Sequence, residues 1–282
     1  MNPGDAPLDV AAALREARAA GVERLDATLL LARLLDRPRS WLIAHDDAPL
    51  DAAQAAGWRD ALARRAAGEP LAYIVGEKEF HGLRLRVDRR VLVPRPETEL
   101  LVDWALELLG GPLAASPEPR VIDLGTGSGA IAIAVKKRCP RAAVVATDAS
   151  EGALALAADN ARACGTLIEF RAGSWWNAVE PAAGFDLVLS NPPYIAAGDP
   201  HLAALADEPA LALTPGGDGL GALAEIVAGA TQRLAPGGWL LLEHGYDQAE
   251  AVRGMLAGHG FATPETRADL AGQPRCSGAR RA

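Results

Sequence analysis

The sequence predicts an α/β protein with a doubly wound, mostly parallel sheet, preceded by a small helical N-terminal domain and a β-hairpin linker. Three observations support this prediction. Residues 8–75 show helical spacing of their apolar side chains, residues 80–93 change to a strand-like alternation, and from Arg120 onward short apolar runs alternate with helical segments. Such an alternation is typical of a parallel sheet covered by helices.

Residues 1–75 form the expected N-terminal helical domain. Val10, Leu14 and Ala17 recur at spacings of three and four residues, and the same spacing returns among the leucines from Leu25 to Leu34. Two interpretations of this domain stay open. It docks a partner or covers a site, or it is a stabilising helical bundle.

Residues 76–96 are expected to link the two domains as a β-hairpin. Apolar and basic residues alternate from His81 to Val87, Asp88–Arg90 would form the turn, and Val91–Val93 would form the second arm. The block Pro94–Glu99 follows. Its two prolines give a stiff extended entry, and its two glutamates fall in the first turn of a helix, where acidic side chains suit the helix dipole.

Residues 97–282 form the expected sheet domain, which begins with a helix running to Gly110. The expected strands lie at 120–124, 143–147, 168–171, 185–190 and 239–243. Helices are expected at 128–138, 152–164, 220–234 and 248–256. A weak pair of terminal strands is expected around Phe261 and Cys276.

The composition excludes several classes of protein. Half of the 282 residues are hydrophobic, so the chain can bury a sizeable core, and a net charge of −8 argues against a general nucleic-acid binder, which carries a basic face. Three cysteines without a C-x-x-C pair and five scattered histidines indicate neither a metal site nor a disulfide framework. The absence of a signal peptide and of an apolar stretch of about 18 residues predicts a cytoplasmic protein.

A glycine-rich turn after the strand at 120–124 is the first candidate site. Its glycines let a ligand approach the backbone, and the following helix N-terminus can receive negative charge. Asp123 before the turn could meet a cationic amine, and Asp148 at the end of the next strand suits a ribose diol, unless it is a helix N-cap. These features predict an S-adenosylmethionine site, with dinucleotide binding as the alternative. The turn consists of Gly125, Thr126, Gly127, Ser128 and Gly129.

The second candidate site is the turn Asn191-Pro192-Pro193-Tyr194, directly after an apolar run. The Asn191 carboxamide and the Pro192 carbonyl present two acceptors for both hydrogens of a planar –NH2 group, and the Tyr194 ring can pack on a planar amide or base. Since such a nitrogen is a poor nucleophile, its orientation toward an electrophile should matter more than a general base. The simpler alternative is a proline pair that only terminates a strand.

Together, residues 124–129, Asp148 and 191–194 resemble the class I methyltransferases with an N-P-P-Y motif, which methylate planar nitrogens. Further blocks extend the resemblance over almost the whole chain: Gly76–Phe80, Pro94–Glu99, Glu208–Pro209 and Gly216–Leu220. With these blocks the chain is similar to the peptide chain release factor N5-glutamine methyltransferases, the HemK-like family. The block Pro94–Glu99 is the most specific, because the sister family acting on a ribosomal-protein glutamine has a different block there.

The resemblance implies how the cofactor is bound. The turn Gly125–Gly129 would line the methionine and ribose portion, Asp148 would bind the ribose hydroxyls, and Asn191 would also contact the cofactor. Trp175 would lie beside the adenine, the alternative being an ordinary core aromatic. Ser174 precedes this tryptophan, where the family often has aspartate.

The resemblance also implies the catalytic and substrate-binding residues. Asn191 and the carbonyl of Pro192 would orient the substrate amide, and Pro193 and Tyr194 would complete its binding, with Asn191, Pro192 and Tyr194 as the catalytic set. Ala210 stands where a basic residue would be expected, after Glu208–Pro209.

The implied activity is methyl transfer from S-adenosylmethionine to the side-chain amide nitrogen of the glutamine in the Gly-Gly-Gln motif of class 1 release factors, without a metal. The enzyme would act as a monomer, with release factors as partners and no direct nucleic-acid binding. The alternatives are N-methylation of a ribosomal-protein glutamine, N-methylation of an exocyclic amine in DNA or RNA, and a cofactor-binding scaffold without catalysis.

Overall fold

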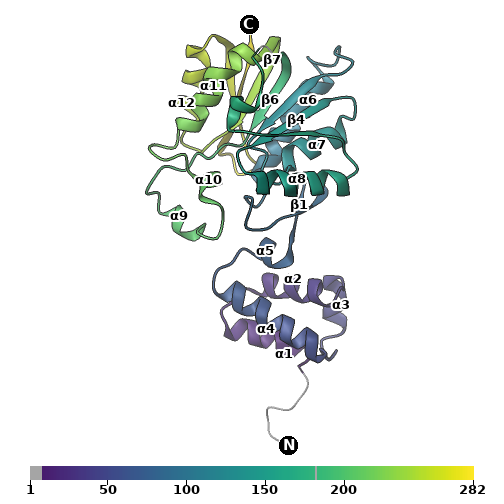
Figure 1. Cartoon of the computed structure of the whole chain (residues 1–282). Helices are drawn as coiled ribbons and strands as arrows, with labels where there is room; N and C mark the ends of the chain where they lie inside the picture. Colours follow the sequence, from purple (N-terminus) through teal and green to yellow (C-terminus); the bar gives the residue numbers. More distant parts are fainter. Residues whose placement is uncertain (1–7, 182) are drawn as a thin grey trace, which may run out of the picture. The chain divides into compact units, whose positions relative to one another are not determined.

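The computed structural model describes residues 8–181 and 183–282 (Figure 1). The chain divides into two compact units, with the boundary between Glu77 and Lys78. Each unit has a hydrophobic core of its own. The first unit is helical, and the second contains a large sheet with its helices.

Helices α1 to α5 make up the described part of the first unit. They are α1 (Val10–Ala19), α2 (Arg24–Leu34), α3 (Arg39–Ala44), α4 (Ala52–Ala66) and α5 (Leu71–Val75). Helix α4 begins with a capping box, in which Asp51 and Gln54 each accept a hydrogen bond from the other's backbone N–H. The centre of the core is Trp58, which is fully buried and donates its indole N–H to Glu16 at 3.1 Å.

The hairpin lies earlier in the chain than the sequence pattern predicts. Strands β1 (Glu77–Phe80) and β2 (Leu83–Arg86) pair with each other, and Val91–Val93, expected as the second arm, is not a strand. The turn is His81-Gly82, not Asp88–Arg90, and its two residues have φ values of 51° and 77°. Two positive φ values in a two-residue turn match the twist of hairpin strands, which explains the position of this turn.

Among the described residues, a seven-stranded sheet forms the centre of the second unit, in the order β5-β4-β3-β6-β7-β9-β8. The strands from β5 to β7 pair in parallel, and β9 pairs antiparallel with both β7 and β8. This is the predicted doubly wound, mostly parallel sheet. The strands are β3 (Arg120–Leu124), β4 (Ala143–Asp148), β5 (Glu169–Ala172), β6 (Phe185–Ser190), β7 (Leu234–Glu243), β8 (Phe261–Ala268) and β9 (Pro274–Arg281).

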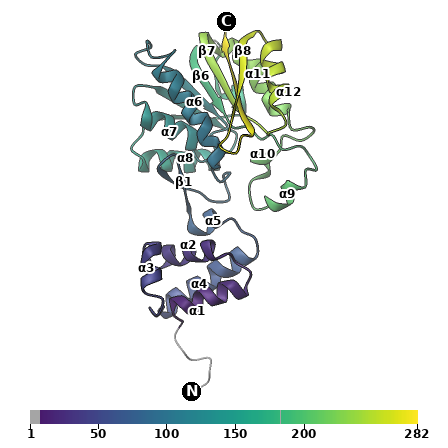
Figure 2. The ribbon, with the colours of Figure 1, turned by 180° about the vertical axis from the view of Figure 1, so that it is seen from behind.

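The sheet of this unit separates two hydrophobic cores, one on each of its faces, and helices cover both. Val121 of β3 packs in the core of α6 and α7, and the next residue, Ile122, packs in the core of α11 and α12. Figure 2 shows these two pairs of helices on either side of the sheet. The helices are α6 (Glu99–Gly110), α7 (Ala130–Arg138), α8 (Glu151–Ala163), α9 (His201–Ala204), α10 (Ala210–Leu213), α11 (Gly221–Arg233) and α12 (Ala249–Gly258), with 3-10 helices η1 (Pro96–Thr98) and η2 (Trp175–Ala178).

The parallel register brings the two candidate turns to one edge of the sheet. Leu124, the last residue of β3, lies beside Thr147 of β4 and Ser190 of β6. The buried Ser190 hydroxyl donates to the Leu124 carbonyl at 2.7 Å, which ties these strand ends together. The turns that begin at residues 125 and 191 are therefore neighbours, at the switch point where doubly wound sheets bind ligands.

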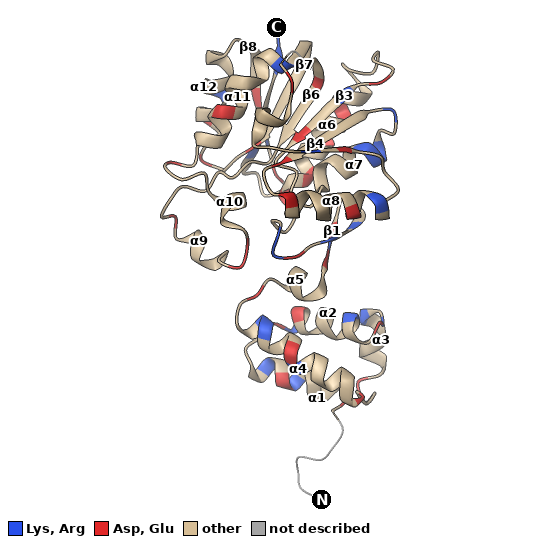
Figure 3. Ribbon diagram, in the orientation of Figure 1, with Lys and Arg blue, Asp and Glu red and all other residues tan. Residues whose placement is uncertain are grey.

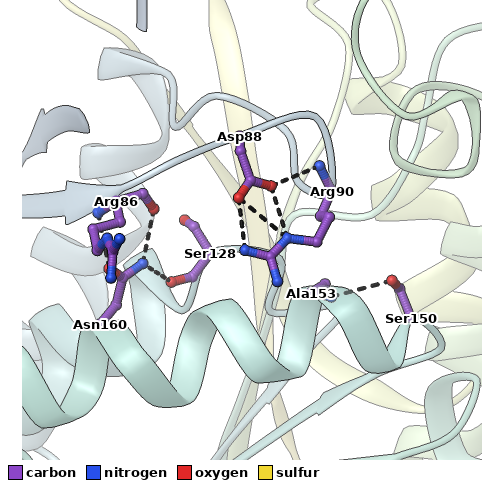
Figure 4. A network of polar contacts seen from close by, with 7 residues as sticks. All are labelled: Arg86, Asp88, Arg90, Ser128, Ser150, Ala153 and Asn160. Carbon is purple, nitrogen blue, oxygen red and sulfur yellow. Dashed lines mark hydrogen bonds and ion pairs between the residues drawn. The ribbon is translucent and has the colours of Figure 1, made fainter. Parts of the chain in front are cut away.

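Asn160 of α8 ties the glycine turn to the hairpin. Its buried carboxamide donates to the carbonyls of Arg86 and Ser128, each at 2.9 Å, and accepts from the Arg86 N–H at 2.8 Å. Figure 4 shows the side chain between these two backbone segments. One asparagine therefore satisfies three backbone groups and fixes the end of the glycine turn.

The Asn160→Ala variant should lower the free energy of unfolding by at least about 1–3 kcal/mol, because it leaves backbone groups of Arg86 and Ser128 without partners. Denaturant unfolding followed by circular dichroism measures this change. Asp159→Ala is the matched control on the same helix, since Asp159 forms an exposed pair with Arg162, worth at most about 1 kcal/mol. Equal free energies for wild type and the Asn160→Ala variant would contradict the role given to Asn160.

Candidate functional site

A cavity of about 760 Å³ opens where strands β3, β4 and β6 end. Residues from the glycine turn, the start of α8, η2 and the segment around α10 line it. The lining includes most of the residues that the sequence pointed to for cofactor binding: Gly125, Thr126, Gly127, Ser128, Asp148, Trp175 and Asn191.

The glycine turn needs its glycines for two reasons. Gly125, Gly127 and Gly129 have φ values of 73°, 55° and 84°, in the left-handed region that favours glycine. A Cβ on Gly125 would lie 3.1 Å from the Trp175 ring, and a Cβ on Gly129 would lie 2.9 Å from the Ile133 side chain. Gly129 therefore packs against helix α7 and is not among the residues that line the cavity.

Asp148 presents its carboxylate to the cavity at the end of β4. One oxygen accepts from the Gly127 N–H and the other from the Ser150 N–H, both at 2.9 Å. Because a carboxylate offers about four acceptor positions, both oxygens can still accept from a diol. The alternative of a helix cap does not hold, since the N-cap of α8 is Ser150, whose hydroxyl accepts from the Ala153 N–H at 3.2 Å.

Asp123 does not reach the cavity, contrary to the expectation that it could meet a cationic amine. Its side chain is fully buried and accepts from the Thr126 hydroxyl at 2.6 Å. Burial raises the pKa of Asp123 to about 7, and the hydrogen bond from Thr126 opposes this rise. Asp123 thus supports the turn, because Thr126, which does line the cavity, is held by it.

The two neighbouring tryptophans have different environments. Trp175 lines the cavity against Gly125, and its φ of 44° is unusual for a non-glycine residue. Trp176 is a core residue, and its indole N–H donates to the Ile226 carbonyl at 3.0 Å. Ser174 also lines the cavity, next to Trp175. The core interpretation therefore holds for Trp176, while Trp175 is placed to cover a flat ligand group.

Asn191 also lines a second, smaller cavity of about 230 Å³. Pro192 and Tyr194 line the smaller cavity, whereas Pro193 lines the larger one. The N-P-P-Y turn therefore forms the boundary between the two, and Asn191 faces both.

A polar network lies behind the N-P-P-Y turn. The Asn191 side-chain N–H2 donates to the Thr98 hydroxyl at 3.1 Å, and the Tyr194 hydroxyl donates to Glu243 at 3.2 Å. Burial raises the pKa of Glu243 to about 7, and the hydrogen bond from Tyr194 and the nearby Thr98 hydroxyl oppose this rise. Burial and the nearby Glu243 also raise the pKa of the Tyr194 phenol, so this hydroxyl keeps its proton at neutral pH.

Glu208 holds the Arg95 guanidinium at the wall of the smaller cavity. Its carboxylate accepts from the Val93 N–H at 3.0 Å and pairs with the Arg95 guanidinium. The Glu208 side chain is 2% exposed, whereas the Arg95 side chain is 34% exposed and lines the cavity. Arg95 therefore has N–H groups available to a bound substrate.

The chain after Tyr194 is held by α10 and by Gln248 at the start of α12, and it packs against Gly219 before α11. The Tyr194 carbonyl accepts from the Gln248 side chain at 2.9 Å, and the Ile195 N–H donates to the Leu213 carbonyl at 3.0 Å. A Cβ on Gly219 would lie 2.3 Å from the Tyr194 carbonyl oxygen, so only glycine fits there. Gly219 thus allows this close approach to the N-P-P-Y turn.

Sequence reasoning missed Thr98, Arg95 and Glu243 as site residues. Thr98 and Arg95 lie in the block Pro94–Glu99, whose specificity was the available signal. Glu243 ends the buried strand β7 as Asp148 ends β4, and a carboxyl at a strand end is a signal that could have found it.

Among residues 8–181 and 183–282, no group of three or more His, Cys, Asp and Glu residues could hold a metal ion. In the same part of the chain, no helix has the length and apolar character needed to cross a membrane.

Comparison with known proteins defines the class. The model described as the methyltransferase small domain matches residues 99–248, and the model of the PrmC N-terminal domain matches residues 8–76. The structure of the Thermus thermophilus 16S rRNA N2 G1207 methyltransferase, in complex with AdoMet and guanosine, covers 73% of this chain and 50% of its own, with a TM-score of 0.53 and 19% identity. The chain is a methyltransferase of the S-adenosylmethionine-dependent class, and its fold is the one expected.

Curated relatives define the family. The release factor glutamine methyltransferase of Bordetella pertussis is 50% identical, over 92% of this chain and 95% of its own length. The protein of the same name from Burkholderia pseudomallei is 49% identical, over 93% and 94%. The chain belongs to the release factor glutamine methyltransferase family, which confirms the resemblance predicted from its motifs.

S-adenosylmethionine is the cofactor of this class, and the larger cavity suits it. Asp148 would accept from the ribose diol with its free acceptor positions, and the Trp175 ring would lie beside the adenine. The glycine turn lets the ligand approach the backbone at the start of α7. When bound, this cofactor supplies a methyl group on a positively charged sulfur.

The Asp148→Ala variant should bind the cofactor about tenfold to a hundredfold more weakly, because a hydrogen bond to a charged group contributes roughly 1.5–3 kcal/mol. Isothermal titration calorimetry with S-adenosylmethionine measures the dissociation constant. Glu151→Ala is the control, since Glu151 is an exposed carboxylate at the start of α8 that does not line the cavity. Unchanged affinity in a folded Asp148→Ala variant would remove Asp148 from the site.

Proposed function

We propose that the protein transfers a methyl group from S-adenosylmethionine to the side-chain amide nitrogen of the glutamine in the Gly-Gly-Gln motif of class 1 peptide chain release factors. The observation that supports this most directly is the position of Asn191 at the boundary of two cavities. The larger cavity would hold the cofactor, and the smaller one would admit the substrate glutamine.

Asn191 and Pro192 would orient the amide. The Asn191 N–H2 donates to Thr98, which leaves its side-chain oxygen free to accept one hydrogen of the substrate amide. The Pro192 carbonyl is the second acceptor, and the Tyr194 ring lines the same cavity. Two acceptors fix the direction of the nitrogen, and Arg95 is placed to bind a carbonyl of the substrate.

Orientation is the main contribution expected from these residues. An amide nitrogen is a weak nucleophile because its lone pair is delocalised, and correct positioning can supply roughly 7–11 kcal/mol of a barrier. After transfer the alkylated nitrogen is strongly acidic, so its proton can leave to water. No residue of the chain has to act as a strong base.

The substrate class sets the expected partners and place of action. Release factors would be bound as proteins, with the enzyme as a monomer in the cytoplasm. Figure 3 shows basic and acidic residues interspersed along the described elements, and the net charge is −8. This distribution favours a protein substrate over methylation of DNA or RNA.

The Asn191→Ala and Asn191→Asp variants should fold and bind the cofactor, with turnover lower by at least about a hundredfold, or roughly 2.7 kcal/mol of transition-state stabilisation. Asp has the size of Asn but cannot donate to Thr98 while accepting from the substrate. The measurement uses labelled S-adenosylmethionine, purified release factor and mass analysis of the Gly-Gly-Gln peptide.

Tyr194→Phe serves as the comparison for this experiment and should be affected less, because the ring is kept and only the hydrogen bond to Glu243 is lost. If the Asn191→Ala variant methylates the glutamine at nearly the wild-type rate, the N-P-P-Y turn only terminates β6. Wild-type protein that labels nucleic acid and not release factor would refute the proposed substrate.

Removal of residues 1–77 should leave cofactor affinity nearly unchanged and impair methylation of the release factor. The residues that line the cofactor cavity all belong to the second unit, which begins at Lys78 and has its own core. Calorimetry and the methylation assay separate the two effects, after circular dichroism has verified folding. Equal methylation by truncated and full-length protein would assign the first unit a role other than substrate docking.

A further inference from the structure

Glu243 is a buried carboxyl that the proposed mechanism leaves unused. It is 1% exposed at the end of β7 and lines neither cavity. Its Oε1 accepts from the Tyr194 hydroxyl, while its Oε2 lacks a well-aligned donor among the described residues. The Thr98 hydroxyl is a nearby donor that favours the charged form and so lowers the pKa of Glu243. A buried carboxyl of this kind costs free energy, so a role is expected for it.

Thr98 is the residue that can connect Glu243 to Asn191, because its hydroxyl accepts from Asn191 at 3.1 Å and its hydrogen is a donor that the unpaired Oε2 of Glu243 needs. A hydroxyl has a single hydrogen, so a Thr98 that donates to Glu243 can only accept from Asn191. The 3.1 Å contact between Thr98 and Asn191 then requires the N–H2 end of Asn191, and the oxygen end faces the cavities. An asparagine amide turned end for end has almost the same shape, so its hydrogen-bond partners decide its orientation.

We propose that Glu243 is a positioning residue for methyl transfer: through Thr98 it holds Asn191 with its side-chain oxygen toward the substrate amide, and through Tyr194 it holds the ring of the N-P-P-Y turn. This inference rests on the function proposed above. It adds a residue that touches neither substrate nor cofactor.

Charged and titratable groups of several elements surround Glu243. Burial is the largest influence, and it raises the pKa of Glu243 to about 7. Arg275 of β9 favours the carboxylate, and Glu97 of η1 disfavours it. Cys276, which pairs with Glu243 across β7 and β9, stays protonated because burial raises the pKa of its thiol. The Tyr194 phenol also faces the carboxyl, to which it donates.

The orientation of Asn191 should therefore depend on pH. Above about pH 7 the Glu243 carboxylate can only accept hydrogen bonds. The direction of the hydrogen bonds from Asn191 through Thr98 to Glu243 is then fixed. Below this pH the carboxyl is protonated and can donate to Thr98, so the direction is lost. Turnover should rise with pH through about 7. Asp123 has a pKa in the same range, so a variant must separate the two groups.

Glu243→Gln is the decisive variant, because glutamine keeps the shape but places an N–H2 donor in the network. At pH 8 we expect kcat to fall by at least about tenfold, with the KM for release factor and the Kd for S-adenosylmethionine within about threefold of wild type. The rise of kcat between pH 6 and about 8 should be lost. The melting temperature should not fall, since the variant removes a carboxyl that is costly to ionise when buried.

Thr98→Val removes the hydroxyl that would link Glu243 to Asn191. It is a second, independent test in case the Glu243→Gln variant misfolds. It keeps the shape of threonine without the hydroxyl and should lower kcat in the same way. Thr98→Ser keeps the hydroxyl and should lie closer to wild type than Thr98→Val. Glu265→Gln is the matched control, since Glu265 is an exposed carboxyl on β8 of the same sheet.

The outcomes separate the inference from the proposed function. Wild-type protein that does not methylate release factor glutamine refutes the function. If wild type is active, a kcat of Glu243→Gln within threefold of wild type, or an unchanged pH profile, overturns the role of Glu243 alone. A fall in melting temperature with a matching loss of cofactor affinity would show a purely structural residue and also overturn it.

Discussion

The hydrogen bond from the Ser190 hydroxyl to the Leu124 carbonyl joins the ends of β3 and β6, and the site depends on this junction. Both strands stop there for local reasons, β3 at a glycine turn and β6 at two prolines. The parallel register places the two turns side by side, so that one can hold a cofactor while the other holds a planar nitrogen. Neither turn could orient a methyl transfer without the other at this fixed separation.

Much of the fold follows from short-range patterns. Strands β3 and β6 have the predicted bounds, because a strand buried on both faces shows as a continuous apolar run. Strand β7 begins at Leu234, earlier than the predicted 239–243, because Ala235, Pro236 and the two glycines after it interrupt the apolar run. The hairpin is the main error. Its turn is His81-Gly82, and histidine has a positive φ less often than asparagine, so the dipeptide does not stand out as a hairpin turn. The sequence pattern therefore predicts the turn at Asp88–Arg90 and the second arm at Val91–Val93. The short helices α9 and α10 have too few residues to show a period.

The site, like the fold, has features that local sequence patterns predict and contacts that they do not. The glycine turn, Asp148 and the N-P-P-Y turn are each recognisable because their chemistry lies in a few consecutive residues or at a strand end. The contacts that position them join residues far apart in sequence: Asn191 and Thr98 are 93 residues apart, and Arg95 and Glu208 are 113 apart. No local pattern reports such a pair. Asp123 shows the opposite kind of error. Its position before the turn suggests contact with a ligand, but its side chain is fully buried.

These long-range contacts give a physical reason for the expectation that the block Pro94–Glu99 is more specific to the family than the N-P-P-Y turn. The turn offers acceptors to any planar nitrogen, so on its own it fits an amide or an exocyclic amine equally well. The block supplies Thr98, which binds Asn191, and Arg95, which Glu208 holds at the wall of the smaller cavity. The Arg95 guanidinium there can donate hydrogen bonds to the carbonyl groups of a peptide. We therefore expect specificity for a glutamine to depend on the residues around the turn, and the transfer itself to depend on the turn.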